Sequence, residues 1–367
     1  MSIEIVAEKS RFNPDKIRKW EEGIGDELPT IKQVEKLAKL YRRPLAVFYL
    51  PDIPRDFDTL KDFRSKNKNQ FSTALVFIIR EIQEKQSWMH EILIEDGESP
   101  LDFVGKFDLD TSPEIVADDI REKLGIITVE AQHDPLKYWI NKSENERIFI
   151  SRSSNYHSRM KIDVEEFKGF VIADIVAPFI FINSADYKNS QLFTLAHELA
   201  HIWINATGVS SDIEIDFRNR TDYDPIEIFC NEVAGNLLLP RKELHNFLVN
   251  SDRITLHSIE QISSFFGVSY IAALIRCLKL NLISDSEFQT LREKIDQGFF
   301  NYINQDVDKT KKGFPNPYYQ KLWRNGKTFS QIVFDFYKGG KITGLEASSL
   351  LNTKINLFTK YEQYVYK

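Results

Sequence analysis

The sequence predicts a mostly helical protein of the α+β class, and three observations lead to that prediction. Apolar residues recur at helical spacing in the N-terminal and C-terminal parts of the chain. Between residues 147 and 183, short runs of aromatic and β-branched residues predict a small mixed or antiparallel sheet. Directly after these runs, "LFTLAHELAHIWI" (192–204) predicts an apolar helix that carries two histidines and a glutamate.

The composition is that of a soluble protein without disulfide bonds. The 367 residues are enough for two or three domains, and 42% are hydrophobic and 28% charged. The net charge of −6 means that nucleic-acid binding would need a local basic patch. Only Cys230 and Cys277 are present, which suits a reducing compartment. The N-terminus shows no secretion signal and no segment is long enough to span a membrane, so we expect a cytoplasmic protein without a membrane partner.

Residues 1–55 predict short helices separated by tight turns. Asn13 is expected to cap a helix that begins with a proline, and Gly23 to end it. Thr30 is expected to cap a second helix with apolar residues at helical spacing. The proline-punctuated "PDIPRDF" (51–57) then indicates a domain boundary.

The middle of the chain changes from helical to strand-like patterns and back. Residues 72–95 and 113–124 predict helices, and the chain is helical again from Pro225 onward. We expect Asn189 or Ser190 to cap the apolar helix. The three predicted strands are "RIFISR" (147–152), "GFVIAD" (169–174) and "PFIFIN" (178–183), and "DIEIDF" (212–217) hints at a further short one.

His197 and His201 in the apolar helix predict a metal site. At a separation of four residues, both imidazoles lie on one helix face and can bind one tetrahedral cation. Glu198 lies beside that cation, where it can accept a proton from an attacking water. His-Glu-x-x-His is the signature of zinc metallopeptidases. The alternative is two hydrogen-bonded core histidines, but the apolar surroundings favour a Zn²⁺ ion that offsets the cost of burial.

A third ligand is expected from the downstream helix of "DYDPIEIFCNEVAGNLLLP" (222–240). An extended motif would need a histidine at position 207, and the chain has Thr207 there. Glu227, by contrast, heads an apolar stripe and should point toward the core, although it could also simply complement the helix dipole. Its rivals, which lie off the stripe or before the helix, are Glu232, Asp224 and Asp222.

Two histidines, one glutamate and an open fourth position predict a catalytic rather than a structural zinc site. We expect Glu198 to act as general base and then to protonate the leaving amine. The strand "GFVIAD", taken as an edge strand beside the helix, would let an extended substrate peptide pair as a further strand. A donor for the oxyanion is also needed, and the candidates, between which the sequence does not choose, are Tyr156, His157 and Arg276.

These motifs resemble the ImmA/IrrE zinc metallopeptidases of bacteria and their mobile elements. The resemblance implies a zincin-like domain of the gluzincin type, with His197, His201 and Glu227 as ligands and Glu198 as catalytic base. It covers roughly residues 130–367. The matching stretches, in order, are "EEFKGFVI", "APFIFIN", "QLFTLAHELAHIWI" and "EIFCNEVAGNLLLP".

The N-terminus is similar to the helix-turn-helix of XRE regulators, which longer members of that family carry. Asn13 would open the recognition helix, with Lys16 and Lys19 toward DNA. The first helix of that module is missing, and Ser10 and Arg11 replace an apolar residue and a glycine. Residues 1–55 hold eleven basic and nine acidic side chains, a weak footprint for phosphate binding.

The resemblance implies regulatory proteolysis, and two hypotheses follow from it. In the first, a zinc endopeptidase cleaves a helix-turn-helix repressor or the product of a neighbouring gene in a stress or mobile-element response. In the second, a DNA-binding repressor or antitoxin sequesters a toxin partner. The expected regions are a truncated XRE-like helix-turn-helix (1–55), a helical linker region (56–129), a zinc metallopeptidase domain (130–245) and a helical C-terminal region (246–367).

Overall fold

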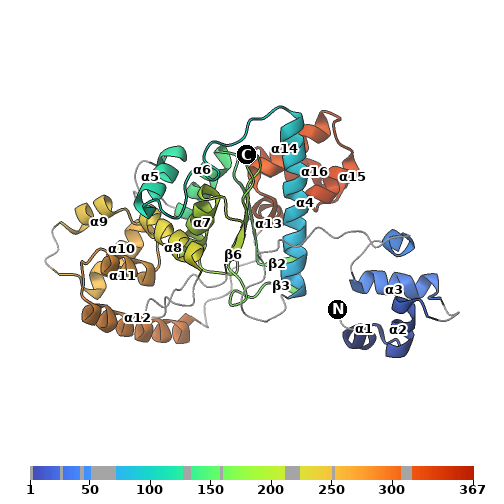
Figure 1. Cartoon of the computed structure of the whole chain (residues 1–367), viewed down its shortest axis with the longest axis horizontal. Coiled ribbons are helices and arrows are strands. Elements are labelled where there is room, and N and C mark those ends of the chain that lie inside the picture. Colours follow the sequence, from blue (N-terminus) through green and yellow to red (C-terminus); the bar gives the residue numbers. More distant parts are fainter. Residues whose placement is uncertain are drawn as a thin grey trace. The chain divides into compact units, whose positions relative to one another are not determined.

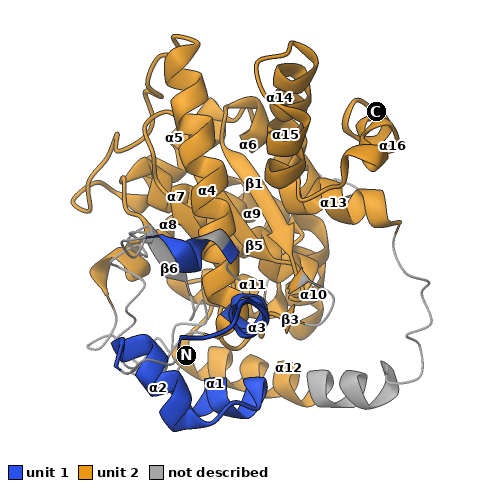
Figure 2. Cartoon of the chain, turned by 90° about the vertical axis from the view of Figure 1, so that its right-hand side faces the viewer, with its two compact units in different colours: residues 1–58 blue, residues 59–367 orange. Residues whose placement is uncertain are grey.

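The computed structural model of the chain divides into two compact units, Met1–Asp58 and Thr59–Lys367 (Figures 1 and 2). Each unit is described by itself. The predicted strand at 212–217 lies outside the described residues. The described residues are 3–24, 28–41, 45–50, 72–126, 134–157, 160–210, 224–249, 253–306 and 316–367.

The N-terminal unit is a set of short helices around a small apolar core. Val6, Ile17 and Leu37 form that core. The predicted turn chemistry is confirmed, because the Asn13 side chain accepts a hydrogen bond from the backbone N–H of Asp15 at 2.8 Å and Gly23 adopts φ 65°. The elements are α1 (Ile3–Ser10), α2 (Pro14–Glu22), α3 (Ile31–Tyr41) and the 3-10 helix η1 (Leu45–Tyr49).

The larger unit combines many helices with a small sheet. Among the described helices, none alone is long and apolar enough to cross a membrane, and α10 and α11 pass such a test only as a pair bent by 108°. The helices are α4 (Thr73–Glu95), α5 (Pro113–Lys123), α6 (Pro135–Asn145), α7 (Lys188–Trp203), α8 (Pro225–Leu238), α9 (Arg241–Leu248), α10 (Leu256–Phe266), α11 (Tyr270–Lys279), α12 (Asp285–Asp306), α13 (Pro317–Asn325), α14 (Lys327–Lys338), α15 (Gly344–Leu350), η4 (Ile355–Leu357) and α16 (Phe358–Val365). The strands are β1 (Phe149–Ser153), β2 (Asn155–His157), β3 (Met160–Lys161), β4 (Gly169–Ile172), β5 (Phe179–Asn183) and β6 (Gly208–Ser210).

The main sheet is mixed, with the strand order β1-β5-β4-β6. Strand β1 runs parallel to β5, whereas β4 is antiparallel to both β5 and β6. The three predicted strands are therefore present, but the expectation that "GFVIAD" forms an edge strand is wrong. Its outer edge is covered because β6 returns along it, with Phe170 opposite Val209. Strands β2 and β3 form a separate antiparallel pair.

The strands bury both of their faces, because alternate side chains point to opposite sides of a sheet. Ile150, Val171 and Ile182 belong to a core that also contains α5, α6, α7 and α8. Their neighbours Phe170 and Phe181 belong to a second core with α4, α14 and α16. Figure 1 shows α4 on one side of the strands and α7 with α8 on the other. Helices therefore cover both faces of the sheet. The finer regional boundaries within this unit stay a prediction.

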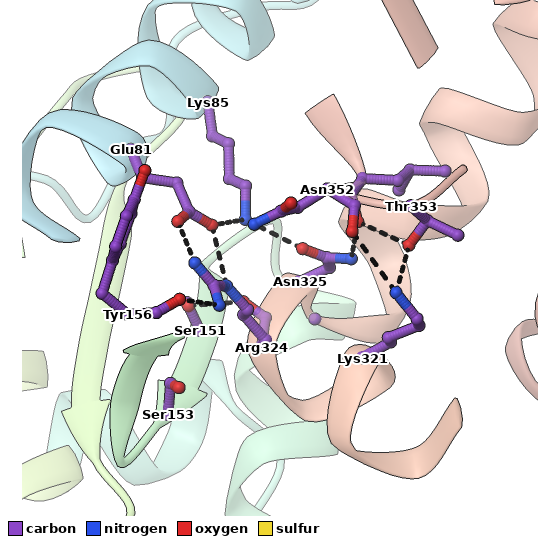
Figure 3. Close-up of polar contacts among 12 residues, drawn as sticks. Glu81, Lys85, Ser151, Ser153, Tyr156, Lys321, Arg324, Asn325, Asn352 and Thr353 are labelled. Atoms are coloured by element: carbon purple, nitrogen blue, oxygen red, sulfur yellow. Dashed lines mark hydrogen bonds and ion pairs between the residues drawn. The ribbon is translucent and has the colours of Figure 1, made fainter. Parts of the chain in front are cut away.

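Buried charges join α4 to the end of α13 (Figure 3). Arg324 donates to both carboxylate oxygens of Glu81 and to the backbone carbonyl of Tyr156. Lys85, whose side chain is 3% exposed, donates to Glu81 and to Asn325 Oδ1, each at 2.9 Å. A charged network therefore ties an early helix to the C-terminal helices across 243 residues of sequence.

Candidate metal centre

Helix α7 is buried along almost its whole length, because it packs between the sheet and helices α5, α6 and α8. From Leu195 to Trp203 every side chain is buried. The expectation that Asn189 or Ser190 caps this helix is wrong, since α7 begins at Lys188 and has no side-chain cap. Asn189 instead donates to the backbone carbonyl of Val268, and Ser190 donates to Asp186 inside the first turn.

The structure brings His197 and His201 of α7 together with Glu227 of α8. The two Nε2 atoms are 3.0 Å apart. Glu227 Oε2 is 3.2 Å from His197 Nε2, and Glu227 Oε1 is 3.4 Å from His201 Nε2. The imidazoles are 0% and 2% exposed and the Glu227 side chain is 27% exposed, so solvent reaches this cluster from the side of Glu227.

The three rival acids are placed elsewhere or cannot be placed. Asp224 caps α8, because its side chain accepts the backbone N–H of Ile226 at 2.9 Å. Glu232 lies further along the helix and pairs with Lys279 at 2.9 Å. Asp222 lies outside the described residues. Among the described acids considered, it is therefore Glu227 that faces the imidazoles.

The geometry of these donors fits a divalent transition metal. Two imidazole nitrogens and a carboxylate oxygen lie within 4.8 Å of one another. Bonds of about 2.0–2.1 Å in a tetrahedral site place neighbouring ligand atoms about 3.3 Å apart. The observed separations of 3.0, 3.2 and 3.4 Å surround that value. Two facing imidazole lone pairs would repel each other at 3.0 Å, and a cation between them removes that repulsion.

Asn231 is a part of the site that sequence reasoning missed. Its Oδ1 lies 3.0 Å from His197 Nδ1, and because an amide oxygen can only accept, Nδ1 carries the proton. The Nε2 lone pair of His197 then points toward His201 and Glu227. Metal-binding histidines in proteins are commonly oriented by such a second hydrogen bond. One signal existed, since Asn231 is a polar residue in an apolar run, one turn after Glu227.

Glu198 lies at the junction of α7 and the sheet and is 0% exposed. A Cβ atom on Gly169 of β4 would lie 3.2 Å from Glu198 Oε1 and only 2.5 Å from the Thr194 methyl group. Only glycine therefore lets β4 pass this close to the carboxylate. The beginning of β4, rather than its far end, adjoins Glu198.

The charges of the cluster depend on one another. Burial would raise the pKa of Glu227, but the two imidazoles hold it well below its usual range. Burial lowers the pKa of His201. Burial also acts to lower the pKa of His197, but Glu227, together with Glu198 and Asn231, raises it overall. The Glu227 carboxylate thus favours a proton on His197, and metal binding would require any such proton to leave, since ligands bind metal in their deprotonated forms.

The proposed oxyanion donors have other partners or cannot be described. The Tyr156 ring stacks on Phe77 of α4 with centroids 5.2 Å apart and belongs to the core on the far face of the sheet from α7. Arg276 donates to the backbone carbonyl of Leu239 at 2.8 Å and to Asn236 at 2.7 Å. The side chain of His157 lies outside the described part of the structure.

The predicted DNA-contacting residues all lie on or beside α2. Asn13 and Lys19 are exposed, and the Lys16 ammonium lies 5.5 Å from the centre of the Trp20 ring. Arg11 adopts φ 58°, in the left-handed region. Ser10 is 1% exposed. The turn before α2 therefore has a backbone conformation that favours glycine.

Comparison with known proteins places this centre in a peptidase context. No curated protein matches the chain. Residues 141–278 match the family model described as the IrrE N-terminal-like domain (Peptidase_M78). The matched range contains the sheet, α7 and α8, and so includes His197, Glu198, His201 and Glu227. The match supports the ImmA/IrrE resemblance for this part of the chain and implies a metallopeptidase type of function.

Proposed function

We propose that this protein is a zinc-dependent endopeptidase of the ImmA/IrrE type that cleaves a transcriptional regulator. The observation that carries the proposal is the convergence of His197, His201 and Glu227 at separations of 3.0–3.4 Å, with Glu198 on the same helix. A purely structural metal site would not need an acid beside its ligands. The ligand spacing, the open side at Glu227 and the buried Glu198 together favour a catalytic site.

The roles of the side chains follow from their positions. A bound zinc ion supplies Lewis acidity, which acidifies water and polarises a carbonyl group. Glu198 accepts the proton of the attacking water and returns it to the leaving amine. Asn231 holds His197 in the tautomer that presents Nε2. The side chains packed around Glu198 exclude bulk water and so strengthen its electrostatic effect on the reacting atoms.

A groove beside the site supports a polypeptide substrate. It has a volume of about 1890 Å³ and runs along α7, α8, α11 and α12. Asn231, which bonds His197, lies in its lining. Apolar Phe193 and Ile275 share the lining with charged groups of both signs, such as Lys168 and Glu260. We propose that a helix-turn-helix repressor or the product of a neighbouring gene binds here, as the resemblance implies.

Metal analysis tests the centre directly. We expect about one zinc ion per chain after reconstitution, and its loss in His197→Ala/His201→Ala, because one carboxylate cannot replace two imidazoles. Asn231→Ala should keep the site but weaken zinc binding by roughly tenfold to a hundredfold, since the orienting hydrogen bond is lost. Elemental analysis and competition with a chromogenic chelator measure both effects. Unchanged zinc in the double variant would refute the site, and Asn246→Ala on α9 serves as the control.

A DNA-binding repressor or antitoxin that holds a toxin partner is the second candidate, and the N-terminal unit favours it. This unit has its own core and exposes Lys19 and Asn13 on α2. We expect Lys16→Ala/Lys19→Ala to weaken binding to the adjacent promoter in a gel-shift assay. The salt dependence of binding should fall as well, since phosphate contacts release counterions. Equal affinity of variant and wild type would remove α2 as a recognition helix.

A further inference from the structure

Strand β6 occupies the place beside Glu198 where an extended substrate would pair. It runs antiparallel to β4, with Ser210 opposite Gly169, Val209 opposite Phe170 and Gly208 opposite Val171. Gly169 is the residue whose Cα faces the Glu198 carboxylate. The backbone of this chain therefore lies on the β4 edge next to the proposed catalytic base.

The end of α7 directs the chain onto this edge. Asn205 adopts φ 51°, a left-handed conformation that ends a helix and reverses the chain. The backbone N–H of Ala206 then bonds the carbonyl of His201 at 2.9 Å. Thr207 Oγ1 accepts the backbone N–H of Ala173 at 3.0 Å, just beyond β4. The contact between this segment and the β4 strand thus begins within six residues of a proposed zinc ligand.

We propose that β6 is an autoinhibitory strand, which must leave β4 before an extended segment of a polypeptide substrate can pair there. The proposal rests on the peptidase function above. Backbone N–H and C=O groups on a strand edge bind any extended chain, so an open β4 edge would accept unfolded proteins of many sequences. Covering that edge with residues 208–210 restricts access to substrates that also bind elsewhere on the enzyme.

The pairing is short enough to be displaced. Only three residues of β6 pair with β4 in the described part of the chain, and each backbone hydrogen bond adds little net stability in water. An intramolecular strand nevertheless competes at a high effective concentration. A regulator that is also bound in the groove could displace β6. An unfolded chain that binds nowhere else on the enzyme could not. The covered edge thus supplies specificity that backbone pairing lacks.

The first test opens the edge. Val209→Pro/Ser210→Pro removes the N–H groups on both sides of β6, so the one that faces β4 is lost. The probe is fluorescein-labelled β-casein, an unfolded protein, with the zinc-loaded Glu198→Gln enzyme as the background. We expect the affinity for casein to rise by about tenfold or more, as for a binding site released from a closed state. Unchanged or weaker binding overturns the proposal.

The second test uses a disulfide bond to hold β6 on the edge of β4. It introduces no proline, so it does not depend on whether the fold tolerates one. Val171→Cys/Gly208→Cys, also in Glu198→Gln, places two thiols on directly paired residues, at a Cα separation suited to a disulfide. The chain's own thiols, Cys230 and Cys277, are both buried. The reduced form should bind casein at least about tenfold better than the oxidised form. Equal binding in both forms, or none in either, overturns the proposal; each single-cysteine variant is a control.

These outcomes distinguish a failure of the autoinhibitory-strand proposal from a failure of the peptidase proposal. All binding is measured without cleavage, so a casein effect can appear even if the zinc peptidase assignment fails. Conversely, zinc content and regulator cleavage with no response to either β6 variant would leave the peptidase intact and remove only the autoinhibitory strand. Zinc content and circular dichroism of each variant confirm that it folds.

Discussion

Replacing Glu198 by glutamine is expected to abolish proteolysis while leaving the metal in place. Glutamine has nearly the same size as glutamate, so it fits the same buried position on α7 beside the start of β4. It cannot accept a proton, so the attacking water stays a weak nucleophile. The loss of a positioned general base costs roughly two to four orders of magnitude in rate. Because Glu198 is not one of the three clustered donors, zinc content should stay near one per chain.

The measurement is co-incubation of the enzyme with the product of the neighbouring gene, with and without chelator. Intact and cleaved regulator are followed by gel electrophoresis and mass spectrometry. Glu122→Gln is the matched control, since this glutamate is exposed on α5 and lies outside the lining of the groove. It should cleave at close to the wild-type rate. Cleavage by Glu198→Gln at the wild-type rate would eliminate the assignment of the base, and loss of zinc would show a ligand or structural role instead.

The sequence predicted the centre well because its signals are local. His197 and His201 share a helix face by spacing alone, and Glu227 follows from the direction of an apolar stripe within one helix. The three aromatic strands were likewise readable, since each carries its own β-propensity. Asn231 could have been found by the same logic, as a polar side chain one turn beyond Glu227.

Non-local pairing was not predictable from these patterns. Strand β6 consists of three residues, Gly208–Ser210, whose composition carries no strand signal. Its presence depends on the edge that β4 offers, so the expectation of an open edge failed. The cap of α7 failed for a similar reason, because Asn189 and Ser190 find tertiary partners instead. The partners Glu81 and Arg324 are 243 residues apart, and no local sequence pattern around either residue predicts that they pair.

Removing the charge of the Arg324 side chain is expected to cause a large loss of stability. Arg324→Met keeps most of the apolar stem but leaves Glu81 paired with Lys85 alone among the described cations of this network. The Glu81 side chain is only 16% exposed. Breaking one partner out of a buried ion pair costs about 3 kcal/mol or more. Urea unfolding followed by circular dichroism should show this as a lower midpoint. Glu81→Met should be worse, since it leaves two neighbouring cations without their anion.

The matched control is Arg292→Met on α12, because Arg292 is 35% exposed and its partner Asp296 is 52% exposed. Its effect should stay within about 0.5 kcal/mol, as for other surface pairs.

The pH dependence of unfolding provides an independent check of the Glu81 network. Burial would raise the pKa of Glu81, but Lys85 and Arg324 lower it from 4.5 to about 2. The ionised carboxylate therefore stabilises the fold above pH 4.5, and that contribution is lost as the pH falls toward 2. This acid-sensitive part should shrink in Arg324→Met, because the carboxylate then has one cation fewer to favour its charged form. Equal urea midpoints for Arg324→Met and wild type would show that the network adds no net stability.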